Sequence, residues 1–348
     1  MHKHLAATII IVLSILACQQ VDQDVFLWGS KTALHDSVDS SHVTPISHPL
    51  SERVIFQSTD AGQTWQDISA CLPKGVDASS LLAIDDKVYV KGAGGFFSSS
   101  DALATLEWKR EMLPDVKVTT IFPGQAGLYA YGLGCGFFLN MQGSGIWIPI
   151  TSSFKGKAVN TFMEARDGSI YIGSDNGIFK SVDGFKTWTQ VFEGDLIYKV
   201  IEGDGLMMAE GTKGLLRSAD HGEHWETVNA KDGRAINTDL ISGGIAAIFI
   251  DGEKSNTQVN AYGMKNNLLA SFDSGMTWVH LDAPFPSIRD IYDIKQAGDY
   301  LFSSLDTGIY RSPDQGKTWR LVQPALNKER FNLVVLGKSV FIILSQGC

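Results

Sequence analysis

Charged side chains recur in short glycine-rich segments, and they are the residues of this chain most able to do chemistry. Asp175 lies in GSDNG (173–177), Glu210 and Lys213 lie in EGTKG (210–214), and Asp306 lies in LDTG (305–308). The turn segment YGMKNN (262–267) and the predicted loops FPSIRD (285–290) and NKERFN (327–332) also carry charged residues. The candidates for a ligand site are Asp175, Glu210, Lys213, Tyr262, Lys265, Arg289, Asp306 and Arg330.

Two kinds of chemistry are open to these residues. Asp175, Glu210 and Asp306 could supply the paired carboxylates of a glycoside hydrolase, which stand about 5–10 Å apart. The same side chains, with the basic residues and the tyrosine, could instead bind a polar ligand without a reaction. Acidic and glycine-rich turns also occur simply because hairpins need them. Deciding among these readings requires the elements that position the turns.

A repeated segment of eight residues supplies those elements. Aligned on tryptophan, the copies are STDAGQTW ending at Trp65, SVDGFKTW at Trp188, SADHGEHW at Trp225, SFDSGMTW at Trp278 and SPDQGKTW at Trp319. Two degraded copies end at Trp108 and Trp147, and the second has Asn140 at the aspartate position. The repeat length of about 41 residues fits four short strands with their turns, which is the unit of a propeller blade.

The repeated residues have a clear role in a turn. An aspartate carboxylate can accept backbone N–H groups, glycine can adopt positive φ, and the tryptophan can bury a large ring in the next strand. These residues are therefore predicted to be structural. They are Ser58, Asp60, Gly62, Trp65, Asp183, Trp188, Asp220, Trp225, Asp273, Trp278, Asp314 and Trp319.

The pattern S-x-D-x-G-x-T-W resembles the Asp-box, the repeat of bacterial neuraminidases. It is also found in sortilin-type receptors, xyloglucan-cleaving propellers and photosystem II assembly factors. The resemblance covers the chain from about residue 50 and implies an all-β, seven-bladed propeller over residues 51–348. It further implies that the boxes lie on the turns between the third and fourth strands, remote from the ligand site. The candidate turns would open on the opposite face.

Both ends of this region complete the ring. RVIFQS (53–58) precedes the first box as a third strand without a first or second, and FNLVVLGKSVFIILSQGC (331–348) follows the last box as two strands without a third or fourth. Together they make one blade, which removes exposed sheet edges. DVFLWGS (24–30) is a possible extra strand or plug, followed by a polar linker.

The N-terminus is typical of an exported lipoprotein. A basic start and an apolar run of 13 residues precede Ile15-Leu16-Ala17-Cys18, which resembles a bacterial lipobox. We therefore expect a signal peptide over 1–17, lipidation of Cys18, and a linker over 18–50. The membrane partner would be reached through this lipid anchor, at the outer membrane or the periplasmic face of the envelope.

Several classes of site are not expected. The net charge of −9, without a basic cluster, argues against nucleic acid. His221 and His224 lie in one exposed box without a third ligand, so we expect no metal, and no motif calls for a cofactor. Cys71 and Cys348 flank the shared blade and could form a disulfide in an oxidising envelope.

The leading interpretation is a lipid-anchored, non-catalytic propeller that binds a protein or glycan at its top face. Sialidase activity is not expected, because the early Arg-Ile-Pro signature of that class is missing. The photosystem II assembly factors are similar in blade number and in their lipobox-type N-terminus. They display an arginine-rich patch, however, whereas the nine arginines of this chain do not cluster. A glycan-active hydrolase with carboxylates near the pore, and a purely structural spacer, remain the alternatives.

Overall fold

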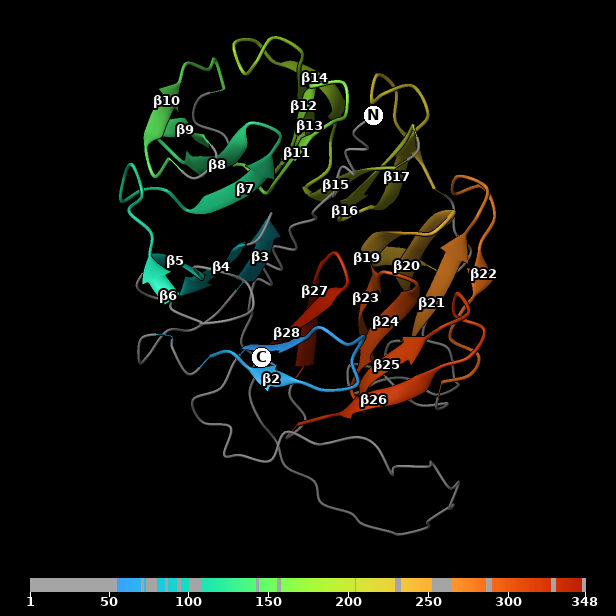
Figure 1. Ribbon diagram of the computed structural model, residues 1–348. Helices are drawn as coiled ribbons and strands as arrows, with labels where there is room; N and C mark the ends of the chain where they lie inside the picture. The colour runs from blue at the N-terminus through green and yellow to red at the C-terminus, as the bar shows by residue number, and fades with distance from the viewer. Residues whose placement is uncertain are drawn as a thin grey trace, which may run out of the picture.

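The chain forms a ring of seven four-stranded antiparallel sheets (Figure 1). The computed structural model describes residues 55–69, 72, 80–84, 87–92, 95–99, 108–141, 144–154, 158–203, 205–228, 233–251, 265–285, 290–326 and 330–345. The prediction of an all-β, seven-bladed propeller is confirmed.

Six sheets are built from strands that are consecutive in the chain. The first three are β3 (Ser80–Ile84), β4 (Lys87–Gly92), β5 (Gly95–Ser99) and β6 (Trp108–Arg110); β7 (Thr120–Gly124), β8 (Gly127–Gly132), β9 (Gly136–Met141) and β10 (Trp147–Ile150); and β11 (Thr161–Glu164), β12 (Ile170–Ser174), β13 (Gly177–Ser181) and β14 (Thr189–Glu193). The next three are β15 (Ile197–Gly203), β16 (Leu206–Gly211), β17 (Gly214–Ser218) and β18 (Glu226–Thr227); β19 (Arg234–Ile241), β20 (Gly244–Asp251), β21 (Lys265–Ser271) and β22 (Val279–His280); and β23 (Ile291–Ala297), β24 (Tyr300–Leu305), β25 (Gly308–Ser312) and β26 (Arg320–Pro324).

The seventh sheet, here called the closing sheet, joins the two ends of the described chain. Its strand order is β2 (Gln66–Asp67), β1 (Ile55–Ser58), β28 (Ser339–Ser345) and β27 (Arg330–Leu336). β1 pairs antiparallel with β28, with Phe56 opposite Ile342. This is the shared blade that the sequence predicts.

An apolar core fills each junction between neighbouring sheets. The junction between the β7–β10 and β11–β14 sheets is mostly aromatic, with Phe122, Tyr129 and Phe162 all buried. The junction between the β15–β18 and β19–β22 sheets is aliphatic around Ile201, Ile245 and Leu269. Because both faces of every sheet are covered in this way, strands such as β12 and β16 are buried along their whole length.

The repeated segments form one recurring turn. At Asp60, the Ser58 hydroxyl donates to Oδ1 at 2.8 Å, and the Thr64 amide and hydroxyl donate to Oδ1 and Oδ2 at 2.9 and 2.6 Å. Gly62 has a φ of 80°, and a Cβ there would lie 3.0 Å from the Phe302 ring. The same aspartate contacts recur in the turns of Asp183, Asp220, Asp273 and Asp314. In each of these turns the aspartate carboxylate thus accepts hydrogen bonds from residues of its own turn.

One copy departs from the others in a way that affects the core. In SVDGFKTW the glycine, Gly184, stands at the fourth position and not at the fifth. Phe185 occupies the fifth position and adopts the positive φ that glycine has there in the other copies, at 75°. The Phe185 ring is buried and lies 5.1 Å from the Tyr129 ring and 5.2 Å from the Phe137 ring, between centroids. The repeat turn here adds an aromatic ring to the junction with the preceding sheet.

Several sequence predictions lie outside the described residues. They are the signal peptide, the lipidated Cys18, the strand at 24–30, the linker, and both Cys71 and Cys348. Cys135 is described, and it is a half-buried free thiol whose sulfur lies 3.4 Å from the Gly132 carbonyl oxygen. Within the described ranges, no helix is both long and apolar enough to cross a bilayer.

Replacing Asp60 by alanine tests the role of the turn. Partial burial acts to raise the pKa of Asp60, but hydrogen bonds from Thr64, Ser58 and Gln63 outweigh it and lower that pKa. We expect Asp60→Ala to reduce the free energy of unfolding by about 1–2 kcal/mol at neutral pH. A carboxylate with a depressed folded pKa stabilises above its unfolded pKa and loses this effect as pH falls through the folded value. Urea titrations should therefore show the deficit of the variant disappearing in acid.

The matched control is Asp175→Ala, in an exposed turn without repeat contacts. It should change the unfolding free energy by less than about 0.5 kcal/mol. Equal effects of both substitutions would contradict a structural role for the repeated aspartate.

Candidate functional site

Three neighbouring inner strands begin with the same irregularity. The pairing register shifts at Tyr198 in β15, at Ile236 in β19 and at Tyr292 in β23, so each of these residues has no partner in the ladder. Such bulges re-aim a side chain and are frequent next to functional sites. Each bulge lies near the start of its strand. This places all three bulges on the face of the propeller that also carries the turns between the second and third strands.

At the bulge of β23, four side chains of mixed chemistry come together. The Arg330 guanidinium lies 5.0 Å from the centroid of the Tyr292 ring. The Asp306 amide donates to the Asp290 carbonyl at 2.9 Å, which places the two aspartates side by side. We call Asp290, Tyr292, Asp306 and Arg330 the Tyr292 group.

Burial has changed the acid–base properties of this group. It raises the pKa of Tyr292 to about 12, with a further contribution from the negative charge of Asp290 and an opposing one from Arg330. Burial also raises the pKa of Asp306, and the charge of Asp290 adds to the increase. The Oδ1 atoms of both aspartates are buried and accept no hydrogen bond from the described residues. The group thus offers acceptors, a cation and an aromatic ring at one place.

A buried ion cluster lies next to the Tyr292 group, further along β23. Lys295 on β23 lies between two carboxylates, with Nζ 2.5 Å from Asp239 Oδ2 and 3.0 Å from Asp293 Oδ1. Burial acts to lower the pKa of Lys295, but Asp239 and Asp293 outweigh it and raise that pKa. Asp293 Oδ2 also accepts the Leu333 amide of β27 at 2.8 Å. The cluster therefore ties β19, β23 and β27 together.

Asn237 connects the ion cluster to the Tyr292 group. Its Nδ2 donates to Asp293 Oδ1 at 2.8 Å and to the Tyr292 carbonyl at 3.2 Å. Because Asn237 is itself buried on β19, it fixes the backbone of the bulge on β23 against the neighbouring sheet. The position of the Tyr292 ring thus depends on contacts between sheets.

A second buried pair lies on the other side of the ion cluster. Lys199 Nζ on β15 lies 4.0 Å from Glu210 Oε1 on β16 and donates to the Thr238 carbonyl. Burial lowers the pKa of Lys199, helped by the nearby charge of Lys295. Burial also raises the pKa of Glu210, although Lys199 opposes it. Both shifts favour the neutral forms, as expected where water is excluded.

The structure brings together only some of the predicted site residues. Asp306 and Arg330 meet at Tyr292, whereas Asp175 and Lys213 are exposed in the turns of the β11–β14 and β15–β18 sheets. Glu210 is not in a turn, as the sequence analysis expected, but is buried in β16, because its register opposite Lys199 keeps it within the sheet. Tyr262 and Arg289 lie outside the described residues, and Lys265 is described only as the start of β21.

The ion cluster was not predicted from the sequence. Lys199, Asp239, Asp293 and Lys295 each stand next to an apolar residue in a strand, as in IYDIKQA of β23. Charged residues next to apolar ones in a strand were the available signal, because buried charges must be paired.

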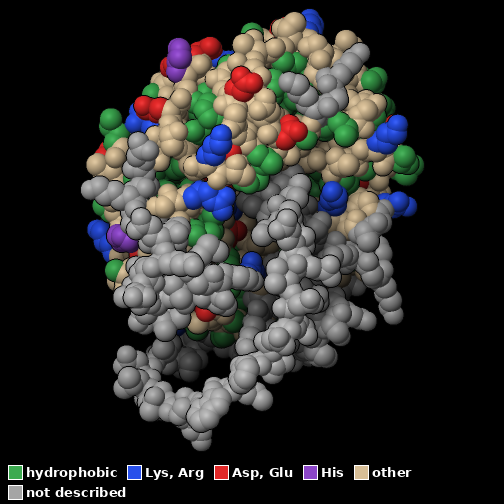
Figure 2. All heavy atoms as spheres, turned by 180° about the vertical axis from the view of Figure 1, so that it is seen from behind, with side chains coloured by type: hydrophobic (Ala, Val, Ile, Leu, Met, Phe, Trp, Pro, Cys, Tyr) green, Lys and Arg blue, Asp and Glu red, His purple; other side chains and the backbone are tan. Residues whose placement is uncertain are grey.

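Other candidates carry no site among the described residues. His224 Nδ1 lies 2.6 Å from Asp220 Oδ2 within its own repeat turn. Across the described ranges, no three potential metal ligands are grouped together. On the part of the molecular face in Figure 2 that is not grey, basic and acidic side chains are interspersed.

Lys295→Met tests the ion cluster. The variant leaves Asp239 and Asp293 buried without their cation, and we expect the free energy of unfolding to fall by about 3–5 kcal/mol. Urea unfolding measures this, with Lys338→Met in the exposed β27–β28 turn as control. A Lys295→Met variant as stable as the control would contradict the ionic role.

Comparisons with known proteins agree with the propeller fold. No family model matches the chain. A probable oligoxyloglucan-reducing end-specific xyloglucanase of Neosartorya fischeri is 24% identical over 238 residues, which is 65% of this chain and 27% of that protein. The chain thus spans about a quarter of the length of this relative.

Two solved structures are similar at low sequence identity. YCF48 bound to D1 peptide superposes with a TM-score of 0.55 and 14% identity, over 87% of this chain and 98% of that one. An ancestral GH74 enzyme superposes with a TM-score of 0.53 and 13% identity, over 78% of this chain and 40% of that one. At these identities the likeness shows the fold, a β-propeller shared by a peptide-bound protein and by glycoside hydrolases.

Proposed function

We propose that this chain is a non-catalytic binding propeller that holds a polypeptide or glycan ligand at the Tyr292 group. The observation that carries the proposal is the convergence of Asp290, Tyr292, Asp306 and Arg330 at the start of β23 and β27. This is the face opposite the repeat turns. Rigid strands position the group, which is what a selective site requires.

The chemistry of the group suits a ligand rich in hydrogen-bond donors. Two buried carboxylate oxygens accept no hydrogen bond from the described residues, and unpaired buried acceptors are costly until a donor reaches them. Amides of a polypeptide and hydroxyls of a glycan both supply such donors. The Tyr292 ring adds an apolar face of the kind on which sugars and side chains pack.

A polypeptide is the first ligand class to test. The peptide-bound YCF48 structure matches this fold along 98% of its length, whereas the chain covers only 40% of the GH74 enzyme. The peptide-bound structure thus matches the propeller as a whole, and a polypeptide is the ligand class that we test first.

The alternative is a glycan-active hydrolase that uses Asp290 and Asp306 as its carboxylate pair. The raised pKa of Asp306 favours it, because a general acid must keep its proton near neutral pH. This alternative requires product release and not only retention of a sugar.

Peptide and glycan arrays probed with the full chain separate these functions. We expect binding on one array, reduced about tenfold or more by Arg330→Met or Asp306→Asn, because each removes a charged partner of the ligand. Asp175→Asn, in an exposed turn of another sheet, is the matched control and should bind normally. Release assays on the same glycans detect the hydrolase, whose activity Asp306→Asn should abolish. Equal binding by all three variants would remove the Tyr292 group as the site.

We further propose that the propeller is tethered to a bacterial envelope membrane through Cys18. The support is the apolar run followed by Ile15-Leu16-Ala17-Cys18 in the sequence. Expression in a bacterium should yield a chain whose N-terminal peptide carries acyl mass at Cys18, as mass spectrometry would show. Cys18→Ala should lose both the acyl mass and the membrane fractionation. An unmodified Cys18 in the mature wild-type chain would refute the tether.

A further inference from the structure

The β7–β10 sheet comes from a segment of unusual composition. From residue 118 to residue 154 the sequence contains no aspartate, glutamate, lysine, arginine or histidine. At the 19% of charged residues found in the whole chain, such a segment would carry about seven. The core of a propeller does not explain this, because the other six sheets carry charges on their outer strands and turns.

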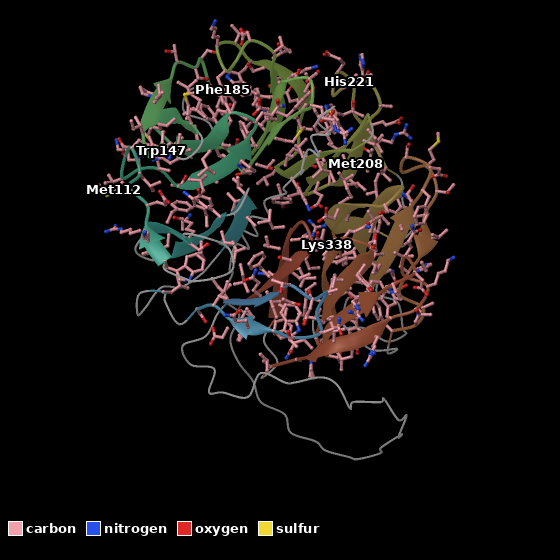
Figure 3. All side chains as sticks on the ribbon, viewed as in Figure 1. Met112, Trp147, Phe185, Met208, His221 and Lys338 are labelled. Atoms are coloured by element: carbon pink, nitrogen blue, oxygen red, sulfur yellow. The ribbon has the colours of Figure 1, made fainter. Side chains whose placement is uncertain are left out.

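The surface of this sheet exposes large apolar side chains. Val116 and Met112, in the loop between β6 and β7, are 99% and 82% exposed. The β7–β10 sheet adds Leu133, Met141, Ile146 and Ile148, all of them exposed. Figure 3 shows Met112 and Trp147 at the same outer edge of the ring, and in Figure 1 the β6–β7 loop projects outward there. We call this surface the apolar rim.

The exposed charges next to the apolar rim are of one sign. Lys109 and Arg110 at the end of β6, and Lys117 in the loop, are all exposed. The two acidic residues of the same loop, Glu111 and Asp115, are half-buried. Asp115 is engaged within the loop, where its Oδ1 accepts the Lys117 amide at 2.8 Å. A chain with a net charge of −9 thus presents a positive border here.

We propose that the apolar rim docks on the surface of an anionic lipid bilayer. Apolar side chains enter the boundary between headgroups and acyl chains, while neighbouring basic residues contact anionic headgroups. The negative charge of the remaining surface is repelled by the same bilayer, so the rim is the part that approaches.

Docking on this side leaves the Tyr292 group accessible. The apolar rim belongs to β6–β10, whereas the Tyr292 group belongs to β23–β27, on the other side of the ring in Figure 1. The inference does not depend on which ligand the Tyr292 group binds. It also does not depend on Cys18, because the contact is made by the propeller itself.

Flotation and hydrogen exchange of the full chain on vesicles test the proposal. The probes are phosphatidylcholine vesicles with and without about 30% phosphatidylglycerol, at low and high salt. We expect amide exchange over residues 111–118 and 144–150 to slow about tenfold on the anionic vesicles and much less on the neutral ones or at high salt. Exchange in the β19–β22 sheet should not change.

Two variants make the test specific. Met112→Asp combined with Val116→Asp should abolish the protection, whereas Met276→Asp, at a residue 71% exposed in the β21–β22 turn, should keep it. Both changes are on the surface, so loss of folding is not expected to intervene. A chain that does not float, or one that floats without protection of these segments, overturns the docking. If the slowing of amide exchange depends on protein concentration and not on lipid composition, the apolar rim contacts a second copy of this chain. That result also overturns docking on the bilayer.

Discussion

The pairing of β1 with β28 is the interaction on which the rest of the ring depends. Four consecutive residue pairs, from Ile55 opposite Ile343 to Ser58 opposite Val340, join segments that are almost 300 residues apart in the chain. Without this pairing, β1 and β28 would each present an open edge, and two sheet junctions would lose a face. Phe341 and Ile342 are fully buried because they face those two junctions on opposite sides of one strand.

Ring closure also determines what the inner strands must accommodate. Seven strands converge around one axis, so polar groups on them are removed from water and have to satisfy one another. Lys295, Asp239 and Asp293 do so across the β19–β22 and β23–β26 sheets, and Asp293 extends the contact to the β27 backbone. The Tyr292 group then occupies the open end of this arrangement. Its residues are displayed by strands that the ion cluster holds in register.

The sequence predicts the repeated turns and strands of this structure. It does not predict which residues from different sheets come together. Trp65, Asp60 and their equivalents recur at fixed spacing because each repeat solves the same local turn, and local contacts are visible in a single sequence. Asp306 and Arg330 are candidates from the sequence because they stand in segments between predicted strands. Their meeting at Tyr292 was not, because it depends on the bulge in β23 and on the packing of three sheets. Glu210 was misplaced for the related reason that a turn boundary differs by two residues, which moves a carboxylate from water into the core.

Charge is distributed unevenly around the ring, and the distribution has a physical logic. On the side of β15 to β27 the chain buries charged side chains, among them Glu210, Asp239, Asp293, Lys199 and Lys295, which is expensive unless they are paired. On the side of β7 to β10 it omits charge entirely and exposes aliphatic side chains to solvent, which is also unfavourable for an isolated monomer. Neither feature improves the stability of a free propeller. A protein that presents a ligand site on one side while resting its other side on an apolar boundary would need both, because a rigid polar site and an uncharged contact surface make opposite demands on side-chain chemistry.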